Sequence, residues 1–136
     1  MSIEKNIQTV KDFFTAIGRG DSVALLALIA EDIEWIIPGE GWPLAGTHRG
    51  HDGLADLLET ASRSIETSTE PREFVAQGDR VLVVGFATGK IKATNKIFED
   101  DWVFAITVRN GKLTNIREYV DTHALARAAR ASNAQA

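Results

Sequence analysis

A run of four strand-like segments in the second half of the chain limits the folds that are open to it. Apolar and polar residues alternate with a period of two over 73–76, 80–92, 96–108 and 112–121. Short turn sequences at 77–79, 93–95 and 110–111 separate these segments. Strands joined by such short turns pair as antiparallel neighbours. We therefore predict an antiparallel meander of four strands.

Two helices are predicted before the first strand of the chain. Apolar residues recur at helical spacing over 3–17, and Gly18 and Gly20 end this helix. Asp21 is a favourable N-cap for a second, strongly apolar helix over 22–30. The short connection predicts a helical hairpin.

A strand, a loop and a third helix are predicted to complete the N-terminal half. Residues 32–37 alternate as a strand does, and the glycine-rich segment 39–50 predicts a loop or short irregular strand at the rim of a pocket. The third helix begins at His51 or Asp52, and the polar, proline-ended segment 64–71 closes it.

The chain of 136 residues has the size of one domain, which we place at 1–136. Helices followed by a strand meander predict an α+β fold, with helices packed on one face of a curved antiparallel sheet. Gly85 and Gly89 lie inside the longest strand pattern and are natural places for the sheet to bend. Asp121 or Thr122 caps an alanine-rich segment, and we expect 123–136 to be a short, frayed C-terminal helix or tail.

Composition excludes several classes of function. The net charge is -4 and no basic run is present, so we expect no nucleic-acid partner. The absence of cysteine excludes disulfides, thiolate catalysis and zinc-thiolate sites. The histidines lack the spacing of a metal site, and no glycine fingerprint for nucleotides occurs, so we expect neither metal nor cofactor. The amphipathic start and the lack of a long apolar run predict no membrane span, which leaves the cytoplasm as the default compartment.

Two segments carry a resemblance to a known family. They are AIGRGDSVALLALIAEDIEWIIPGEGWPLAGTHRG, over 16–50, and VRNGKLTNIREYVDTHAL, over 108–125. These segments, and the order of elements from about residue 3 to 125, resemble the domain shared by nuclear transport factor 2 (NTF2), ketosteroid isomerase, the SnoaL-like polyketide cyclases and limonene epoxide hydrolase. The second segment, over 108–125, looks most like the SnoaL-like branch of this family. The resemblance implies a cone-shaped, mixed but mostly antiparallel sheet wrapped around three N-terminal helices, the cystatin-like α+β barrel.

The catalytic groups of these relatives are largely missing when the resemblance is followed residue by residue. Ile37, before Pro38, stands where ketosteroid isomerase has its aspartate base, and Phe13 stands where it has its tyrosine. Gly85 and Ala87 stand where limonene epoxide hydrolase has its aspartate and arginine. Only the acid of the last strand remains, which is the principal acid and base of the SnoaL-like cyclases.

That acid corresponds to Glu118. Strand alternation leaves two orientations open. In the first, Ile116, Glu118 and Val120 face the interior beside Asp100, Trp102 and Phe104, where desolvation raises the pKa of the glutamate. In the second, Glu118 is on the convex face, and Arg117, Tyr119 and Asp121 point inward.

The remaining candidates each have a structural alternative. Asp100 is either a second acid or the partner of Arg49 or Lys96, and His48 is either a proton donor at the rim or an exposed loop histidine. Asp121, by contrast, is favoured as a helix cap. The expected ligand-binding side chains, which are otherwise simply core, are Trp35, Ile37, Trp42, Trp102, Phe13 and Val120.

Two classes of function follow. The first is a cofactor-independent enzyme that performs proton-transfer chemistry, such as isomerisation, cyclisation or hydration, on a small apolar or cyclic substrate. Glu118 is its acid or base, and Asp100 or His48 assists. The second is a non-catalytic ligand-binding or accessory domain with the same pocket. Because both faces of the strand over 80–92 are largely apolar, we also expect a homodimer through the convex sheet face.

Overall fold

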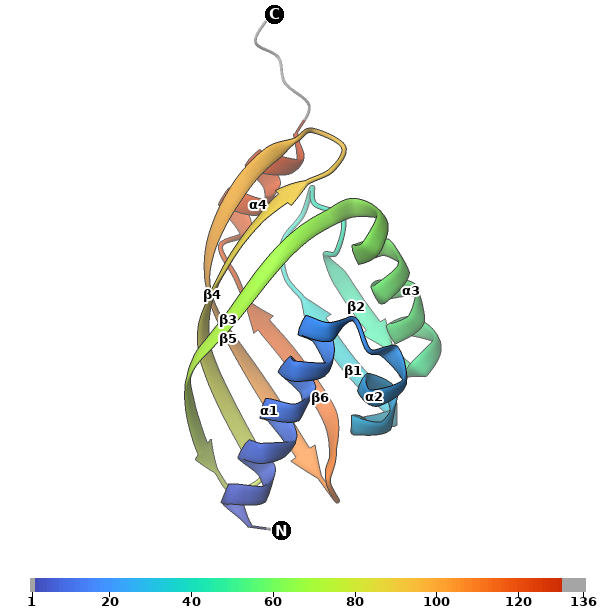
Figure 1. Cartoon of the computed structure of the whole chain (residues 1–136), viewed down its shortest axis with the longest axis vertical. Coiled ribbons are helices and arrows are strands. Elements are labelled where there is room, and N and C mark those ends of the chain that lie inside the picture. Colours follow the sequence, from blue (N-terminus) through green and yellow to red (C-terminus); the bar gives the residue numbers. More distant parts are fainter. Residues whose placement is uncertain (1, 131–136) are drawn as a thin grey trace, which may run out of the picture.

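A curved, six-stranded sheet with helices against one side makes up the fold (Figure 1). The computed structural model describes residues 2–130. Its elements are α1 (Ile3–Arg19), α2 (Ser22–Leu28), β1 (Ile29–Ile37), β2 (Gly46–Arg49), α3 (Gly50–Ser64), β3 (Ile65–Gln77), β4 (Arg80–Ile91), β5 (Lys96–Arg109), β6 (Lys112–Tyr119) and α4 (Thr122–Ala129).

The strand order is β2-β1-β6-β5-β4-β3, and the sheet is open, with β2 and β3 at its edges. Strands β3 to β6 form the predicted antiparallel meander, and β2 pairs antiparallel with β1. The pair β1 and β6 is parallel, which makes the sheet mixed. The predicted α+β fold with a mostly antiparallel sheet is confirmed.

The boundary between α2 and β1 lies earlier than predicted. We predicted a helix over 22–30 and a strand from Asp32, but α2 ends at Leu28 and β1 begins at Ile29. Ile29 pairs with Leu113 of β6 and is 1% exposed. Burial against the last strand therefore overrides the helical pattern of this apolar run.

The largest difference between the sequence prediction and the structure concerns β3. The polar segment 64–71 was predicted to close α3, but β3 begins at Ile65 and pairs with β4 along its full length. This strand is at the edge of the sheet, where water covers most of its side chains, so it lacks a buried alternating face. Pro71 is tolerated because it lies at an edge, next to a shift in register before Glu73.

The ends of helices α1 and α4 agree with the capping residues in their local sequence. Ser2 caps α1, and Gly20 ends it with a φ of 64°, whereas Gly18 is still helical. Asp121 accepts a hydrogen bond from the amide of Ala124 at 2.9 Å and caps α4, as predicted. Residues 131–136, part of the expected tail, lie outside the described residues. Between residues 2 and 130, no helix has both the length and the apolarity that crossing a membrane requires.

Gly85 and Gly89 make room for aromatic rings. In the register between β4 and β5, Gly85 is opposite Trp102, and Gly89 is opposite Phe98. A Cβ atom added to Gly85 would overlap the Trp102 ring, and one added to Gly89 would lie 2.6 Å from the Phe98 ring. The long strands β3 to β5 curve over the helices (Figure 1), and the aromatic rings lie against their backbone.

Candidate functional site

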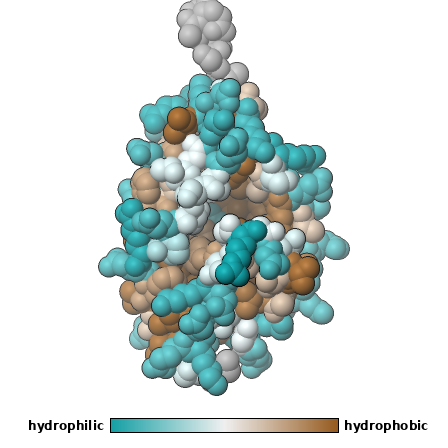
Figure 2. All heavy atoms as spheres, viewed as in Figure 1, coloured by the Kyte–Doolittle hydropathy of each residue, from teal (hydrophilic) through white to brown (hydrophobic). Residues whose placement is uncertain are grey.

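A cavity of about 170 Å³ lies between the sheet and the helices. Figure 2 shows a hollow with hydrophobic walls on this side of the molecule. The cavity has room for on the order of ten water molecules, or for a ligand with a similar number of heavy atoms. Its lining residues are Phe14, Ile17, Trp35, Ile37, Trp42, Leu44, Leu57, Leu58, Ala61, Ile65, Thr67, Thr69, Ala87, Phe98, Asp100, Trp102, Phe104, Glu118, Val120 and Leu125.

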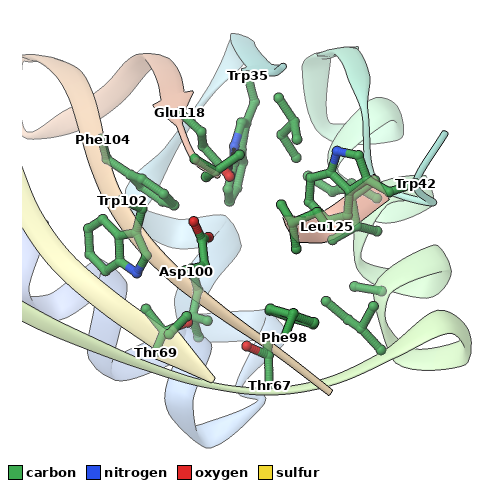
Figure 3. A pocket seen from close by; sticks show the side chains of 18 of the residues that line it. Trp35, Trp42, Thr67, Thr69, Phe98, Asp100, Trp102, Phe104, Glu118 and Leu125 are labelled. Atoms are coloured by element: carbon green, nitrogen blue, oxygen red, sulfur yellow. Dashed lines mark hydrogen bonds between the residues drawn. The ribbon is translucent and has the colours of Figure 1, made fainter. Parts of the chain in front are cut away.

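Glu118 points into this cavity from β6 (Figure 3). Its side chain is 8% exposed and lies opposite Phe104 of β5, while Arg117 and Tyr119 face outward. The first of the two predicted orientations is therefore confirmed. The reason is the period of two along β6, which places Ile116 and Glu118 on one face.

The environment of Glu118 favours its protonated form. Burial raises the pKa of its carboxyl from 4.5 to about 8, and the nearby charge of Asp100 acts in the same direction. Trp35 Nε1 donates a hydrogen bond to Glu118 Oε2 at 2.7 Å, which opposes the rise in pKa without cancelling it. Glu118 is therefore mostly protonated at pH 7.

Asp100 points into the same cavity from β5 (Figure 3). It is 5% exposed, and its Oδ1 accepts a hydrogen bond from the backbone amide of Asp121 at 2.6 Å. Burial raises the pKa of Asp100 to about 6; the amide hydrogen bond opposes this rise, and the charges of Asp121 and Asp101 add to it. At pH 7 Asp100 is therefore mostly ionised.

Neither cation proposed as a partner pairs with Asp100. Arg49 forms an ion pair with Glu34 at 3.1 Å, because β2 and β1 place the two residues opposite each other. Lys96 Nζ donates to the carbonyl of Arg130 at 2.8 Å.

An aromatic cluster forms one wall of the cavity. The ring of Phe14 stacks on Trp102, with centroids 5.5 Å apart and planes inclined by 15°. Trp102 also contacts Phe104, at a centroid separation of 4.6 Å. The nitrogen of the Trp102 indole is buried and, within residues 2–130, has no hydrogen-bond acceptor.

Comparison with known proteins identifies the family. The family model described as the SnoaL-like domain matches residues 10–116. The chain belongs to the SnoaL-like family. This SnoaL-like protein also resembles many solved NTF2-like structures, so the predicted superfamily is confirmed.

Three relatives illustrate the range of similarity. A crystal structure of an NTF2-like protein from Burkholderia xenovorans LB400 is 69% identical, with a TM-score of 0.89, over 96% of this chain and 99% of that one. TerC, co-crystallised with polyporic acid, is 28% identical, with a TM-score of 0.83, over 92% of this chain and 98% of that one. An uncharacterised protein from Mycobacterium tuberculosis H37Rv is 28% identical over 120 residues, which are 88% of this chain and 91% of that protein.

Most ligand-binding residues predicted for the SnoaL-like protein line the cavity, but Phe13 does not. Its ring is fully buried between Phe14, at a centroid distance of 5.1 Å, and Trp35, at 5.6 Å. Successive helix positions are rotated by about 100°, so only one of two adjacent phenylalanines can face the cavity. The rotation of α1 against the sheet selects Phe14. The predicted residues that do line the cavity are Trp35, Ile37, Trp42, Trp102 and Val120.

The histidines lie away from the cavity wall. A ring nitrogen of His48 is 3.0 Å from the carbonyl oxygen of Leu44, and one of His51 is 3.0 Å from that of Ile29. His48 is thus a half-buried strand residue that bonds to the backbone, and it is not among the lining residues. Within the described part of the chain, no three His, Asp or Glu side chains are grouped so that they could hold a metal ion.

Leu125 is a lining residue that the sequence analysis missed. The alanine-rich tail was expected to fray, yet Leu125 of α4 is 2% exposed and packs with Ile91 and Phe98. The available signal was Asp121, because a capped helix directly after β6 can fold back over the end of the sheet.

Proposed function

We propose that this SnoaL-like protein is a cofactor-independent catalyst of proton transfer, acting on a small apolar or cyclic substrate with an enolisable carbonyl group. One observation carries the proposal. Asp100 and Glu118 line the same apolar cavity, and their pKa values, about 6 and about 8, lie on opposite sides of neutrality. Two carboxyls held in opposite protonation states supply a base and an acid at the same pH.

The proposed reaction divides the work between these two groups. The Asp100 carboxylate removes a proton from the carbon next to the carbonyl. The Glu118 carboxyl donates a hydrogen bond or its proton to the carbonyl oxygen, where negative charge develops, and an enol results. Return of a proton to a different carbon gives an isomer, and attack of the enol carbon on a second carbonyl gives a cyclised product.

Trp35 positions the acid in this proposal. Its Nε1–H donates to Oε2 of Glu118, so a proton on that carboxyl resides on the other oxygen, Oε1. The apolar side chains around Glu118 offer its carboxylate little stabilisation, and this burial maintains the raised pKa of Glu118.

The experiment measures exchange rather than a product, because the natural substrate need not be known. β-Tetralone, a bicyclic enolisable ketone, is incubated with the protein in D₂O at pH 7, and deuterium incorporation is followed by NMR. We expect exchange above the buffer rate, lowered by about a hundredfold or more in both Asp100→Asn and Glu118→Gln. Two exposed acids provide the controls, and Asp56→Asn and Glu99→Gln should both exchange as the wild type does.

A non-catalytic ligand-binding or accessory role is the second candidate. The apolar cavity supports it, as does the solved relative TerC, which was co-crystallised with polyporic acid. Binding of β-tetralone by the wild type, with exchange no faster than in buffer, would favour this role and refute the catalytic proposal.

We also propose a homodimer through the convex sheet face. The register places Leu82 beside Val75, and Val84 beside Val103, which in turn lies beside Tyr119. Four of these side chains are at least 37% exposed, so an apolar patch extends over four strands. The same patch on a second copy is its proposed cover.

Light scattering after size-exclusion chromatography tests the dimer. We expect twice the mass of the chain for the wild type, and the monomer mass for Val84→Asp. A wild-type monomer at all concentrations would refute the dimer.

We further propose the cytoplasm as the compartment, since a chain without cysteine is compatible with reducing conditions.

A further inference from the structure

The three tryptophans differ in what their indole N–H groups do. Trp35 donates to Glu118 at 2.7 Å, and Trp42 donates to the carbonyl of Pro38 at 3.0 Å. Trp102 is 3% exposed, and its Nε1 has no acceptor among the described residues. A buried N–H without an acceptor is destabilising and rare in native proteins, so the Trp102 N–H calls for an explanation.

The Trp102 ring is held in place by its neighbours. It stacks on Phe14 and contacts Phe104. Its six-membered ring lies against Gly85, where any side chain would overlap it. The ring therefore has little freedom to rotate toward another acceptor in the protein.

Trp102 lines the cavity, and the nitrogen of its ring lies on the side of Asp100 (Figure 3). On β5, Asp100 and Trp102 are two residues apart and share the concave face, and the protonated Glu118 lies on the neighbouring strand. Beside the threonine hydroxyls, the cavity thus combines an ionised acceptor, Asp100, with two donors, the Glu118 carboxyl and the Trp102 indole.

We infer that Trp102 Nε1–H donates a hydrogen bond to an oxygen of the bound ligand, and that this ligand is a flat, aromatic or conjugated ring carrying a carbonyl or phenolic oxygen. The inference deepens the proposed function, since it assigns a substrate class to the same cavity. The aromatic wall of Phe14, Trp102 and Phe104 selects a flat ring, because such rings gain from offset or tilted stacking. The unpartnered N–H of Trp102 favours a ligand with a hydrogen-bond acceptor, which a carbonyl or phenolic oxygen supplies.

Two probes with the same carbon skeleton test this. β-Tetralone carries a carbonyl oxygen, and tetralin does not. We expect Trp102→Phe, which keeps an aromatic ring and loses the N–H, to weaken β-tetralone binding by about tenfold more than it weakens tetralin binding. Trp42→Phe is the matched control, because the Trp42 N–H bonds to Pro38 within the protein; this substitution should not change the affinity ratio of the two probes.

A measurement on the wild type guards against misfolding of the variant. The chain has three tryptophans, and so three indole N–H signals in a ¹⁵N–¹H NMR spectrum. We expect β-tetralone, and not tetralin, to shift the Trp102 signal downfield, as a new hydrogen bond does. Equal loss of affinity for both probes in Trp102→Phe, an unmoved Trp102 signal, or no binding of either probe would overturn the inference.

The two proposals fail separately. If Trp102→Phe loses more affinity for the ketone than for tetralin while the wild type exchanges no deuterium, the ligand class stands and the catalytic proposal falls. If the wild type catalyses exchange and Trp102→Phe binds the ketone as well as the wild type does, the catalytic proposal stands and the role of Trp102 falls.

Discussion

Replacing Glu118 by glutamine should stabilise the protein, and the gain should grow with pH. In the unfolded chain this glutamate ionises near its ordinary pKa of 4.5, whereas burial raises its pKa in the folded protein to about 8. Between these two values the unfolded state loses the proton and the folded state keeps it. The free energy of unfolding therefore falls as the pH rises through this window.

The size of the effect follows from the two pKa values. One pKa unit corresponds to about 1.4 kcal/mol. Glu118 therefore lowers the free energy of unfolding by roughly 3 kcal/mol at pH 7 and by roughly 5 kcal/mol above pH 8. This is a large part of the 5–15 kcal/mol typical of a domain. Glutamine is neutral at every pH, and its oxygen can still accept the hydrogen bond of Trp35, so Glu118→Gln removes the cost and preserves the contact.

Urea unfolding at pH 5, 7 and 9, followed by tryptophan fluorescence, measures the difference. We expect the variant to be more stable than the wild type by roughly 1 kcal/mol at pH 5, 3 kcal/mol at pH 7 and 5 kcal/mol at pH 9. The exposed Glu99→Gln is the control and should show no such trend. A difference that does not change with pH would refute the buried, protonated state of Glu118.

Two further substitutions test the supports of the site. In Trp35→Phe the pKa of Glu118 should rise above its wild-type value of about 8, because the lost hydrogen bond favours the carboxylate; a ¹³C NMR titration of the Glu118 carboxyl measures it, and a lower pKa would contradict this role. Gly85→Ala should destabilise the protein by about 1–3 kcal/mol in thermal unfolding, because its Cβ overlaps Trp102. A Cβ at Gly18 would have no atom within 4 Å, so Gly18→Ala should instead stabilise the protein by up to about 1 kcal/mol. Equal effects of the two substitutions on stability would contradict the close approach of Trp102 to Gly85.

Local pattern was sufficient for much of the fold. The turns after β3, β4 and β5, the cap of Asp121 and the inward face of β6 all depend on residues close together in the sequence. Backbone sterics and hydrogen bonds over a few residues decide such features, so they are visible without the rest of the molecule.

The sequence pattern did not predict the structure where residues far away in the sequence determine it. The segment that begins β3 is polar because it is at an edge, and position in the sheet is not encoded in the segment itself. Ile29 belongs to a strand because it pairs with Leu113, which is 84 residues further along the chain. Similarly, the choice of Phe14 over Phe13 depends on how α1 is rotated against the sheet.

The candidate site shows the same division. The sequence by itself determined that Glu118 shares a face with Ile116, since alternation along a strand is a local property. Only the tertiary structure decided that this face is sealed by an aromatic wall, that Trp35 reaches Glu118, and that the Trp102 N–H is left without a partner. A raised pKa requires the removal of water from every side of the carboxyl, and residues from several strands and helices accomplish this only when the whole chain is folded.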